Sequence, residues 1–366
     1  MIDRAEVLVL THHLSSIRLF GTGSNVTRDS IVVRLEDGDG LVGWGETYLV
    51  PGAVDAARAI ADGAVGRNAE DAAADLAGRH GLHRWALGAV SMALDDLRAR
   101  RRGVPVSELF GPRVRDRVPA YASSRGYVQG WTAEESWRDE AQVMHDAGFR
   151  AIKLRTGRYP LEEEIGAIER VVAGAPSMTW MADGNGAYSL DESRRLASAL
   201  EGLGFRWLEE PLPTNDYAAY APLARELSIP LAGGEILESA EAAAAPLAGG
   251  SFDIIQPDVS IAGGIGGVLE VAALARSRGV ACIPHACSGA IATVATLHLL
   301  AVLPDGAGTP PWAEPILEHD VGENPIRTEL VARPIEVRDG WVDIPVGPGL
   351  GIDVDEAAVR RLAVPA

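Results

Sequence analysis

A series of ionisable residues in the second half of the chain could act together in catalysis. Each follows a short run of strand-forming residues, and successive members are 30, 26, 26, 23, 27 and 29 residues apart. The series is Lys153, Asp183, Glu209, Glu235, Asp258, His285 and Glu314. Because one strand and one helix of a parallel sheet take up about 30 residues, these side chains should meet at one edge of a sheet or barrel.

Three consecutive members, Asp183, Glu209 and Glu235, are carboxylates. They would repel one another at close range, and a divalent cation would remove that repulsion. A ligand set of carboxylates without histidine or cysteine favours Mg²⁺ over Zn²⁺. The sequence therefore predicts a Mg²⁺ site at these three residues.

The remaining members are suited to proton transfer and to binding an oxyanion. A carboxylate beside an imidazole fixes the tautomer of the ring and raises its basicity, so Asp258 and His285 indicate a general base. Lys153 and Arg155 are two residues apart on one strand, so both should point to the same side. Glu314 could donate a hydrogen bond to a substrate oxygen if it is protonated. We expect these five residues to be catalytic.

Lys153 is the single lysine of a chain that contains 32 arginines. An ammonium group is compact and its pKa can shift on burial, whereas a guanidinium keeps its proton. A lysine kept at this one strand end favours a functional role. A Schiff-base aldolase centred on Lys153 is an alternative chemistry, but such an enzyme would not need three carboxylates on neighbouring strands.

The elements that must position these residues can be located by their patterns. From residue 117 onward, β-rich runs alternate with helical patterns, which predicts an α/β protein with a (β/α)₈-type barrel whose active site lies at the carboxyl ends of the strands. The strands are expected at 118–122, 151–155, 179–183, 206–209, 230–235, 253–258, 280–285 and 312–314. The helices are expected at 134–147, 161–173, 190–203, 217–227, 240–247, 267–278 and 289–303.

The first 115 residues have a different pattern. The runs Ile31–Leu35 and Leu41–Glu46 flank a turn signal, and helix formers dominate Ala53–Arg102, which predicts an α+β capping domain. Strand-like runs at 335–338 and 341–344 predict that the tail rejoins this domain. We therefore divide the chain into a capping domain (1–115), a barrel (116–325) and a C-terminal segment (326–366).

Composition excludes several classes of function. The chain has 366 residues and a formal net charge of −18, so its surface should repel nucleic acid and anionic lipid. The longest apolar run, Gly289–Leu303, has 15 residues and is too short to span a membrane. The N-terminus does not have the pattern of a secretory signal, which favours a cytoplasmic location. We expect Cys282 and Cys287 to be free thiols and not a zinc site.

The motifs around these residues together resemble the enolase superfamily. Within it the chain looks like the mandelate racemase subgroup of the mandelate racemase/muconate lactonizing enzyme family. In the first domain the resemblance rests on Ala93–Leu97 and Gly103–Gly111. In the barrel it rests on A-I-K-L-R (151–155), D-G-N (183–185), W-L-E-E-P (207–211), G-E (234–235), Q-P-D (256–258), P-H (284–285) and A-E-P (313–315). It covers nearly the whole chain, and the combined spacing is specific although each motif alone is weak.

The resemblance implies a mechanism. A substrate carboxylate would be bound by Mg²⁺ and Lys153, and His285 with Asp258 would remove the proton α to that carboxylate to give an enediolate. Glu314 would hydrogen-bond the carboxylate and stabilise the charge of the intermediate. The resemblance also implies a small carboxylate substrate, a substrate-binding role for Asn185, and a homo-oligomer.

Position 155 departs from the family pattern. Many members of the subgroup have lysine at both ends of a Lys-x-Lys motif, and the second lysine is a base on the face opposite the histidine. Arg155 is a poor base, because the pKa of arginine lies above about 12. This favours one-base chemistry, above all dehydration of a sugar acid to a 2-keto-3-deoxy acid. Cycloisomerisation of a sugar acid or lactone, and racemisation or epimerisation, are the alternatives.

A barrel that only binds a sugar acid is an alternative of another class. The complete set of metal, base and lysine positions argues against it. Substrate specificity should come from two capping-domain segments, Thr11–Ser24 and Glu46–Val54, which are expected to cover the active site as loops. Their candidate substrate-binding residues are His12, His13, Phe20 and Tyr48. Polar loops of this kind suit a polyol better than an aromatic acid.

Overall fold

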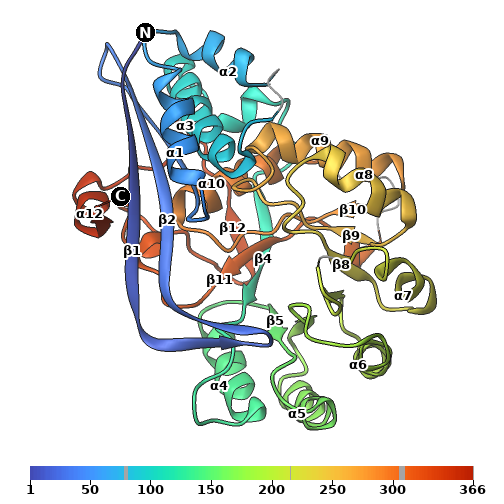
Figure 1. The fold of residues 1–366 in the computed structure, drawn as a ribbon. Coiled ribbons are helices and arrows are strands. Elements are labelled where there is room, and N and C mark those ends of the chain that lie inside the picture. The colour runs from blue at the N-terminus through green and yellow to red at the C-terminus, as the bar shows by residue number, and fades with distance from the viewer. Residues whose placement is uncertain (78–80, 215, 305–309, 366) are drawn as a thin grey trace.

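The computed structural model describes residues 1–77, 81–214, 216–304 and 310–365. A long two-stranded hairpin and three helices, drawn in blue and cyan, lie against a barrel drawn in green to red (Figure 1). None of the helices in the described part of the chain is long and apolar enough to cross a membrane.

The capping domain is an antiparallel sheet covered by helices. Its strand order is β13-β1-β2-β3, with β1 (Ile2–Phe20), β2 (Gly23–Asp37), β3 (Val42–Tyr48) and β13 (Ala363–Val364). The helices are α1 (Ala53–Asp62), α2 (Ala69–Ala77) and α3 (Arg84–Arg102), followed by the 3₁₀ turn η1 (Val106–Leu109). Gly43 and Gly45 let β3 lie directly on α3, since a Cβ at either position would meet the helix backbone.

The predicted hairpin between residues 31 and 46 is confirmed, but the segment Thr11–Ser24 is not a loop. It is the far end of the hairpin formed by β1 and β2, whose ladder runs from Ile2↔Asp37 to Phe20↔Gly23 with a register irregularity between His13 and Arg18. In Figure 1 this hairpin extends from the capping helices to the level of β5. It therefore brings capping-domain side chains to the barrel.

In the described part of the chain, eight parallel strands form the barrel, in the order β10-β9-β8-β7-β6-β5-β4-β11. They are β4 (Arg117–Ser123), β5 (Ala151–Arg155), β6 (Thr179–Asp183), β7 (Leu208–Glu209), β8 (Leu231–Gly233), β9 (Ile254–Ile255), β10 (Ala281–Cys282) and β11 (Leu317–Asp320). The helices between them are α4 (Ala133–Asp146), α5 (Leu161–Gly174), α6 (Leu190–Gly202), α7 (Tyr220–Glu226), α8 (Ala240–Gly249), α9 (Ile265–Ser277) and α10 (Ala290–Val302). The predicted barrel is confirmed.

Large apolar side chains fill the inside of the barrel below the strand ends. This cluster contains Tyr121, Met181, Trp207, Ile254, Ile283 and Ile316, all buried. Packed layers of this kind close a barrel to water, so polar chemistry is confined to the end where the strands finish. We call that end the mouth.

The eighth strand was predicted in the wrong place. Residues 312–314 are not a strand, because Pro311–Ala313 forms the 3₁₀ turn η2, and the strand that pairs with β4 is β11. Pro310 and Pro311 lack N–H donors and have a φ suited to the start of a helical turn, and Pro315 follows directly. The strand can begin only beyond these prolines.

The C-terminal segment contacts both domains. After the short helix α11 (Pro325–Thr328), β12 (Trp341–Asp343) pairs antiparallel with the barrel strand β4, so the expectation that this run rejoins the capping domain was wrong. The end of the chain does return there, since α12 (Glu356–Leu362) is followed by β13, which pairs with β1. The exact domain boundaries at 115 and 325 stay a prediction.

Buried polar contacts seat the capping domain on the mouth. The carboxylate of Glu46, on β3, accepts hydrogen bonds from the backbone N–H groups of Gly289 (2.8 Å) and Ala292 (3.1 Å) at the start of α10. A helix N-terminus favours a negative group, although burial raises the pKa of Glu46. Next to it, the Thr47 hydroxyl donates to the carbonyl of Ser260 (2.7 Å). The end of β3 is thereby fixed beside the barrel strands.

Candidate active site

The sheet register aligns the predicted residues at the mouth. Arg155 pairs with Asp183 and Asp183 with Glu209 on adjacent strands, and an isolated parallel bridge joins Asp258 to His285. A cavity of about 460 Å³ lies between the mouth and the capping domain. Its lining includes Phe20, Tyr48, Arg155, Asn185, Glu235 and His285, all of them predicted from the sequence.

Lys153 is fully buried among carboxylates. Its Nζ lies 2.5 Å from Glu209 Oε1, 3.0 Å from Glu318 Oε1 and 3.7 Å from Asp183 Oδ2. Burial disfavours the charged ammonium, but these carboxylates outweigh burial and raise the pKa of Lys153 well above its ordinary value. Lys153 therefore stays a cation, which argues against Schiff-base chemistry at this residue.

Arg155 and Asn185 hold the carboxylate of Asp183. Arg155 Nη1 donates to Asp183 Oδ2 (2.9 Å) and to Asn185 Oδ1 (3.2 Å). The Asn185 backbone N–H and side-chain amide donate to the two oxygens of Asp183 at 2.8 and 3.0 Å, with Asn185 in the left-handed region at φ 45°. Burial disfavours the charged guanidinium, but Asp183 helps to outweigh burial and the pKa of Arg155 is raised above its ordinary value. A guanidinium that holds its proton in this way is a poor base.

Negative charge accumulates on the neighbouring strands. Glu209 is buried, and its Oε2 accepts from Trp207 Nε1 (3.1 Å) and Gln256 Nε2 (2.8 Å). Burial raises the pKa of Glu209 to about 7. Lys153 lowers this pKa, but Asp183, Glu318 and Glu235 raise it and offset the effect of Lys153. Burial and Glu235 also raise the pKa of Glu210. The carboxylates here outnumber the cations, so a divalent cation fits the charge of the site.

The third predicted ligand has a different orientation. Glu235 Oε2 lies 3.2 Å from His285 Nε2. As the side chains stand, no three acidic, histidine or cysteine side chains within the described ranges are grouped closely enough to hold a metal ion. The Glu235 side chain is 28 % exposed and borders the cavity, whereas Asp183 and Glu209 are buried and fixed. Glu235 is thus the adaptable member of a donor set that suits Mg²⁺.

His285 and Asp258 form a pair that extends into the capping domain. His285 Nδ1 lies 2.7 Å from Asp258 Oδ2, and the Tyr48 hydroxyl donates to the same oxygen at 2.8 Å. The Ser260 backbone N–H donates to the other oxygen (2.6 Å). Burial disfavours the imidazolium, but Glu235 and Glu318 raise the pKa of His285 above its ordinary value. Because Asp258 holds Nδ1, Nε2, which lies beside Glu235 at the cavity, is the ring nitrogen that would exchange a proton with a substrate.

Glu314 is not in the site, and Glu318 occupies the position expected for it. The Glu314 side chain is exposed, and its carbonyl accepts from Arg206 before β7, at the end of the barrel opposite the mouth. Glu318, on β11, is buried, with Oε2 3.9 Å from His285 Nε2 and accepting from the Ala286 N–H (3.2 Å). Burial favours a neutral carboxyl, but Lys153 and His285 hold the pKa of Glu318 far below its usual range. The regular spacing of strand ends in the sequence pointed to Glu314, but the prolines move the start of the last strand to Leu317, so Glu318 lies at that place.

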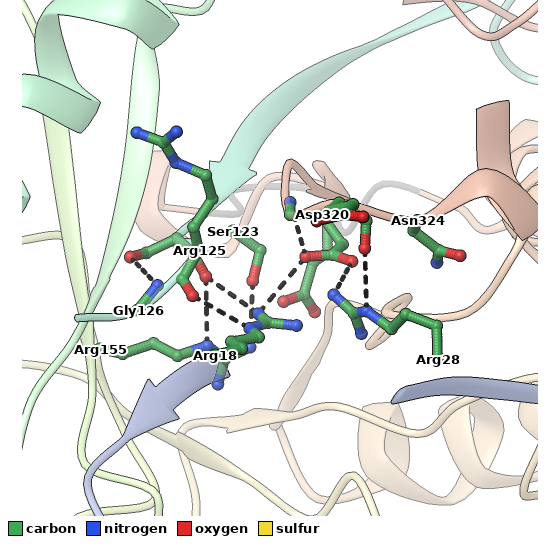
Figure 2. Close-up of polar contacts among 12 residues, drawn as sticks. Arg18, Arg28, Ser123, Arg125, Gly126, Arg155, Asp320 and Asn324 are labelled. Carbon is green, nitrogen blue, oxygen red and sulfur yellow. Dashed lines mark hydrogen bonds and ion pairs between the residues drawn. The ribbon is translucent and has the colours of Figure 1, made fainter. Parts of the chain in front are cut away.

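Two of the predicted capping residues lie outside the cavity. His12 Nε2 pairs with Glu323 Oε1 (2.8 Å), and His13 is exposed on β1. The same hairpin supplies two residues that the sequence did not single out, Arg18 and Arg28, and both line the cavity. Figure 2 shows Arg18 beside Arg155 and Asp320, with Arg28 on the other side of Asp320. The alternation of side-chain direction along a strand could have indicated Arg18 and Arg28 only if the β1–β2 hairpin had been predicted from the sequence.

Comparison with known proteins gives the family. Residues 19–111 match the mandelate racemase / muconate lactonizing enzyme N-terminal domain, and residues 136–358 match the enolase C-terminal domain-like family. The chain therefore belongs to the mandelate racemase/muconate lactonizing enzyme family of the enolase superfamily. It is therefore an enzyme of that superfamily, with the capping domain and barrel that the sequence indicated.

Similar proteins act on sugar acids. The chain is 32 % identical to the D-galactarolactone cycloisomerase of Agrobacterium fabrum over 92 % of both proteins. It is 30 % identical to the L-talarate/galactarate dehydratase of Salmonella typhimurium, covering 90 % of this chain and 81 % of that protein. A Streptomyces coelicolor racemase crystallised with bound magnesium is 29 % identical, with a TM-score of 0.85 and full coverage of both chains.

Proposed function

We propose that this enzyme removes the proton α to the carboxylate of a sugar acid, in a Mg²⁺-dependent reaction, and eliminates a β-hydroxyl to give a 2-keto-3-deoxy acid. The observation that carries the proposal is the asymmetry of the site. A histidine with its carboxylate partner borders the cavity, and at the position where the family pattern has its second lysine this chain has an arginine paired with Asp183. One base suffices for elimination, whereas racemisation needs proton-transfer groups on both faces.

Each residue of the site would have a separate role in the reaction. Asp183, Glu209 and Glu235 would hold Mg²⁺, which supplies Lewis-acid stabilisation of the negative charge that develops on the substrate carboxylate. Lys153, a buried cation, would bind a carboxylate oxygen. Asp258 holds Nδ1 of His285, so that Nε2 can take the α-proton.

Elimination then completes the reaction. The electron pair of the broken C–H bond forms the enediolate and then a C=C bond as the β-hydroxyl leaves, and the imidazolium of His285 protonates the departing oxygen as water. The resulting enol tautomerises to the 2-keto acid. Glu318 lies where Glu314 was expected, but it is held ionised, so its charge stabilises the cations of Lys153 and His285 and it would not donate a hydrogen bond to the intermediate.

Cycloisomerisation is the second candidate, and the similarity to the D-galactarolactone cycloisomerase favours it. The same base would remove an α-proton, and the leaving group would be the ring oxygen of a lactone or anhydro sugar. Its product keeps all atoms of the substrate, whereas dehydration loses one water. The predicted cytoplasmic location and homo-oligomeric state, and the expected absence of nucleic-acid and membrane partners, stay predictions.

A sugar-acid panel incubated with Mg²⁺ in D₂O, followed by NMR and mass spectrometry, tests the proposal. Loss of the α-proton signal, a new methylene signal and loss of one water indicate the dehydratase. A methylene signal without loss of water indicates the cycloisomerase, and inversion or exchange alone indicates a racemase or epimerase. No exchange with any aldonate, aldarate or lactone would overturn the proposal.

A matched pair of histidine variants assigns the base. His285→Asn should stop α-proton exchange and leave Mg²⁺ binding intact. His145→Asn, at a half-exposed histidine on α4 that lies outside the cavity, should exchange at the wild-type rate. Exchange that persists in His285→Asn would assign the base to another residue.

A further inference from the structure

Three guanidinium groups lie on the wall of the cavity where the capping hairpin meets the barrel, and one of them, that of Arg155, is paired with Asp183 of the acidic strands. Arg18 and Arg28 come from the β1–β2 hairpin and Arg155 from β5, and all three line the cavity. Arg18 Nη2 and Arg155 Nε both donate to the carbonyl of Ser124, at 3.0 and 3.4 Å. Figure 2 shows that the hairpin side chains reach across to the barrel at this point. This wall therefore belongs to both domains.

Asp320 binds the two hairpin arginines but does not balance their charge. Its Oδ2 is 2.6 Å from Arg28 Nη2 and 3.0 Å from Arg327 Nη1, and its Oδ1 is 3.4 Å from Arg18 Nη2. Asp320 is fully buried, and the Arg18 and Arg28 side chains are 9 % and 11 % exposed. One carboxylate thus faces three guanidinium groups that are largely removed from water.

The neighbouring acidic groups do not remove this excess. Asp29 also lines the cavity, and its oxygens accept from the hydroxyls of Thr11 (2.8 Å) and Thr27 (2.6 Å). The Glu323 carboxylate is bound by His12 and Ser15. The three guanidinium groups around Asp320 are those of Arg18, Arg28 and Arg327. Even if Asp29 is counted with Asp320, they face two carboxylates, so one positive charge is left beside this part of the cavity.

The position of the wall defines what it can bind. A substrate carboxylate bound near Lys153 and Glu235 would occupy the acidic end of the cavity, and the sugar chain would then extend towards Arg18 and Arg28, which line the same cavity. Asn25 and Thr27 also line the cavity and can bind hydroxyls. Guanidinium groups bind carboxylates in a two-pronged geometry, which gives both affinity and selectivity.

We propose that Arg18 and Arg28 form a subsite for a second carboxylate at the far end of the substrate, which makes the substrate a sugar diacid or its lactone and not an aldonate. The inference rests on the proposed function and narrows it. Family membership does not decide the matter, because similar proteins include both a galactarate dehydratase and D-galactonate dehydratases. In a diacid lactone, opening of the ring by elimination releases a carboxylate that the same arginines would receive.

Matched substrates test the subsite. Galactarate and galactonate share their hydroxyl configuration and differ in one terminal group, a carboxylate or a primary alcohol; glucarate and gluconate form a second pair. Wild-type enzyme should use a diacid, or its monolactone, with kcat/KM at least about 100-fold above that for the matched aldonate. Arg28→Gln and Arg18→Gln should each lower kcat/KM for the diacid about 10- to 100-fold and change that for the aldonate less than about threefold.

Arg327→Gln is the matched control. It removes another guanidinium from Asp320, but Arg327 does not border the cavity. If the arginines only tie the hairpin to the barrel, Arg28→Gln and Arg327→Gln should lower both activities alike. If they form the subsite, only Arg18→Gln and Arg28→Gln should reduce the preference for the diacid.

The outcomes separate this inference from the proposed function. Equal or better turnover of aldonates would overturn the subsite and leave the function standing. If no sugar acid reacts, the proposed function fails, and calorimetry with galactarate and galactonate still decides the subsite. Binding of galactarate at least tenfold tighter than that of galactonate, lost in Arg28→Gln, would support it, and equal binding of the two would overturn it.

Discussion

The two ends of the cavity differ in charge and in origin. The acidic end consists of Asp183, Glu209 and Glu235, which lie at or just after the carboxyl ends of three consecutive strands of one domain. The basic end consists of Arg18 and Arg28 from the capping hairpin, which meet Asp320 at the end of the last barrel strand, β11. About 300 residues of chain separate the partners at the basic end. Neighbouring members of the acidic end are only one strand-helix repeat apart in the sequence.

This difference shows how each end balances its charge. At the acidic end burial raises the pKa of Glu209 to about 7, so its carboxylates are poorly compensated by the protein itself. At the basic end the arginines hold the pKa of Asp320 far below its usual range despite burial. The acidic end therefore depends on a cation from solution, while the basic end is held together by the protein and keeps surplus charge for an anion.

Glu235→Gln should have the largest effect on activity. The change removes one charge from the predicted ligand set, so Mg²⁺ binding should weaken and turnover should fall about 10³-fold or more. Calorimetric titration with Mg²⁺ and α-proton exchange by NMR are the measurements. The control is Glu241→Gln, the same change at an exposed glutamate on α8 outside the cavity. Unchanged activity in Glu235→Gln would remove this residue from the metal site.

Asp320→Asn should have the largest effect on stability. It leaves buried guanidinium groups around a neutral amide, and breaking a buried ion network in this way costs about 3–5 kcal/mol of the free energy of unfolding. Urea denaturation measures it. Glu336→Gln, which breaks the exposed pair with Arg338, should leave the midpoint unchanged. A small loss in Asp320→Asn would mean that other groups hold the arginines.

The two ends also differ in how far the sequence predicts them. The βα repeat places Lys153, Asp183, Glu209 and His285 at the mouth correctly, because strand spacing and the period of two determine where these side chains point. The repeat failed at Glu314, where prolines move the strand start and Glu318 takes the place.

The basic end has no such repeat. Thr11–Ser24 was identified as a segment that covers the mouth, yet its histidines face away and Arg18 faces in. A hairpin whose register shifts between His13 and Arg18 does not preserve simple alternation, so the residue that reaches the cavity depends on the irregularity. The orientation of Glu235 towards His285 likewise depends on side-chain electrostatics that no spacing encodes.

Tyr48→Phe should reduce activity moderately, because Tyr48 contacts Asp258, which in turn holds His285. Removal of its hydroxyl takes one hydrogen bond from a buried carboxylate, and kcat should fall about tenfold with KM nearly unchanged. Tyr159→Phe, which removes a hydroxyl bound to the Trp131 carbonyl outside the cavity, is the control. A raised KM with unchanged kcat would instead restore the substrate-binding role predicted from the sequence.

Alkylation of the two cysteines should report the charge of the basic end with the smallest disturbance. Burial raises the pKa of Cys282 to about 12. Burial and Asp320 raise the pKa of Cys287 too, but His285, Arg18 and Arg28 outweigh them, so its pKa lies below the ordinary value. A lower pKa gives more thiolate at a fixed pH, and Cys287 borders the cavity. Peptide mapping after iodoacetamide treatment at about pH 7.5 should therefore find Cys287 modified first.

The arginine variants make this labelling a test of the positive field. Arg28→Gln should raise the pKa of Cys287 and slow its alkylation, while Arg327→Gln, which leaves the cavity wall intact, should change the rate less. A diacid ligand should protect Cys287 in the wild type and not in Arg28→Gln. If Cys287 reacts equally fast with and without Arg28, the hairpin arginine does not set the potential of the cavity, and the contrast between its two ends would rest on the acidic strands alone.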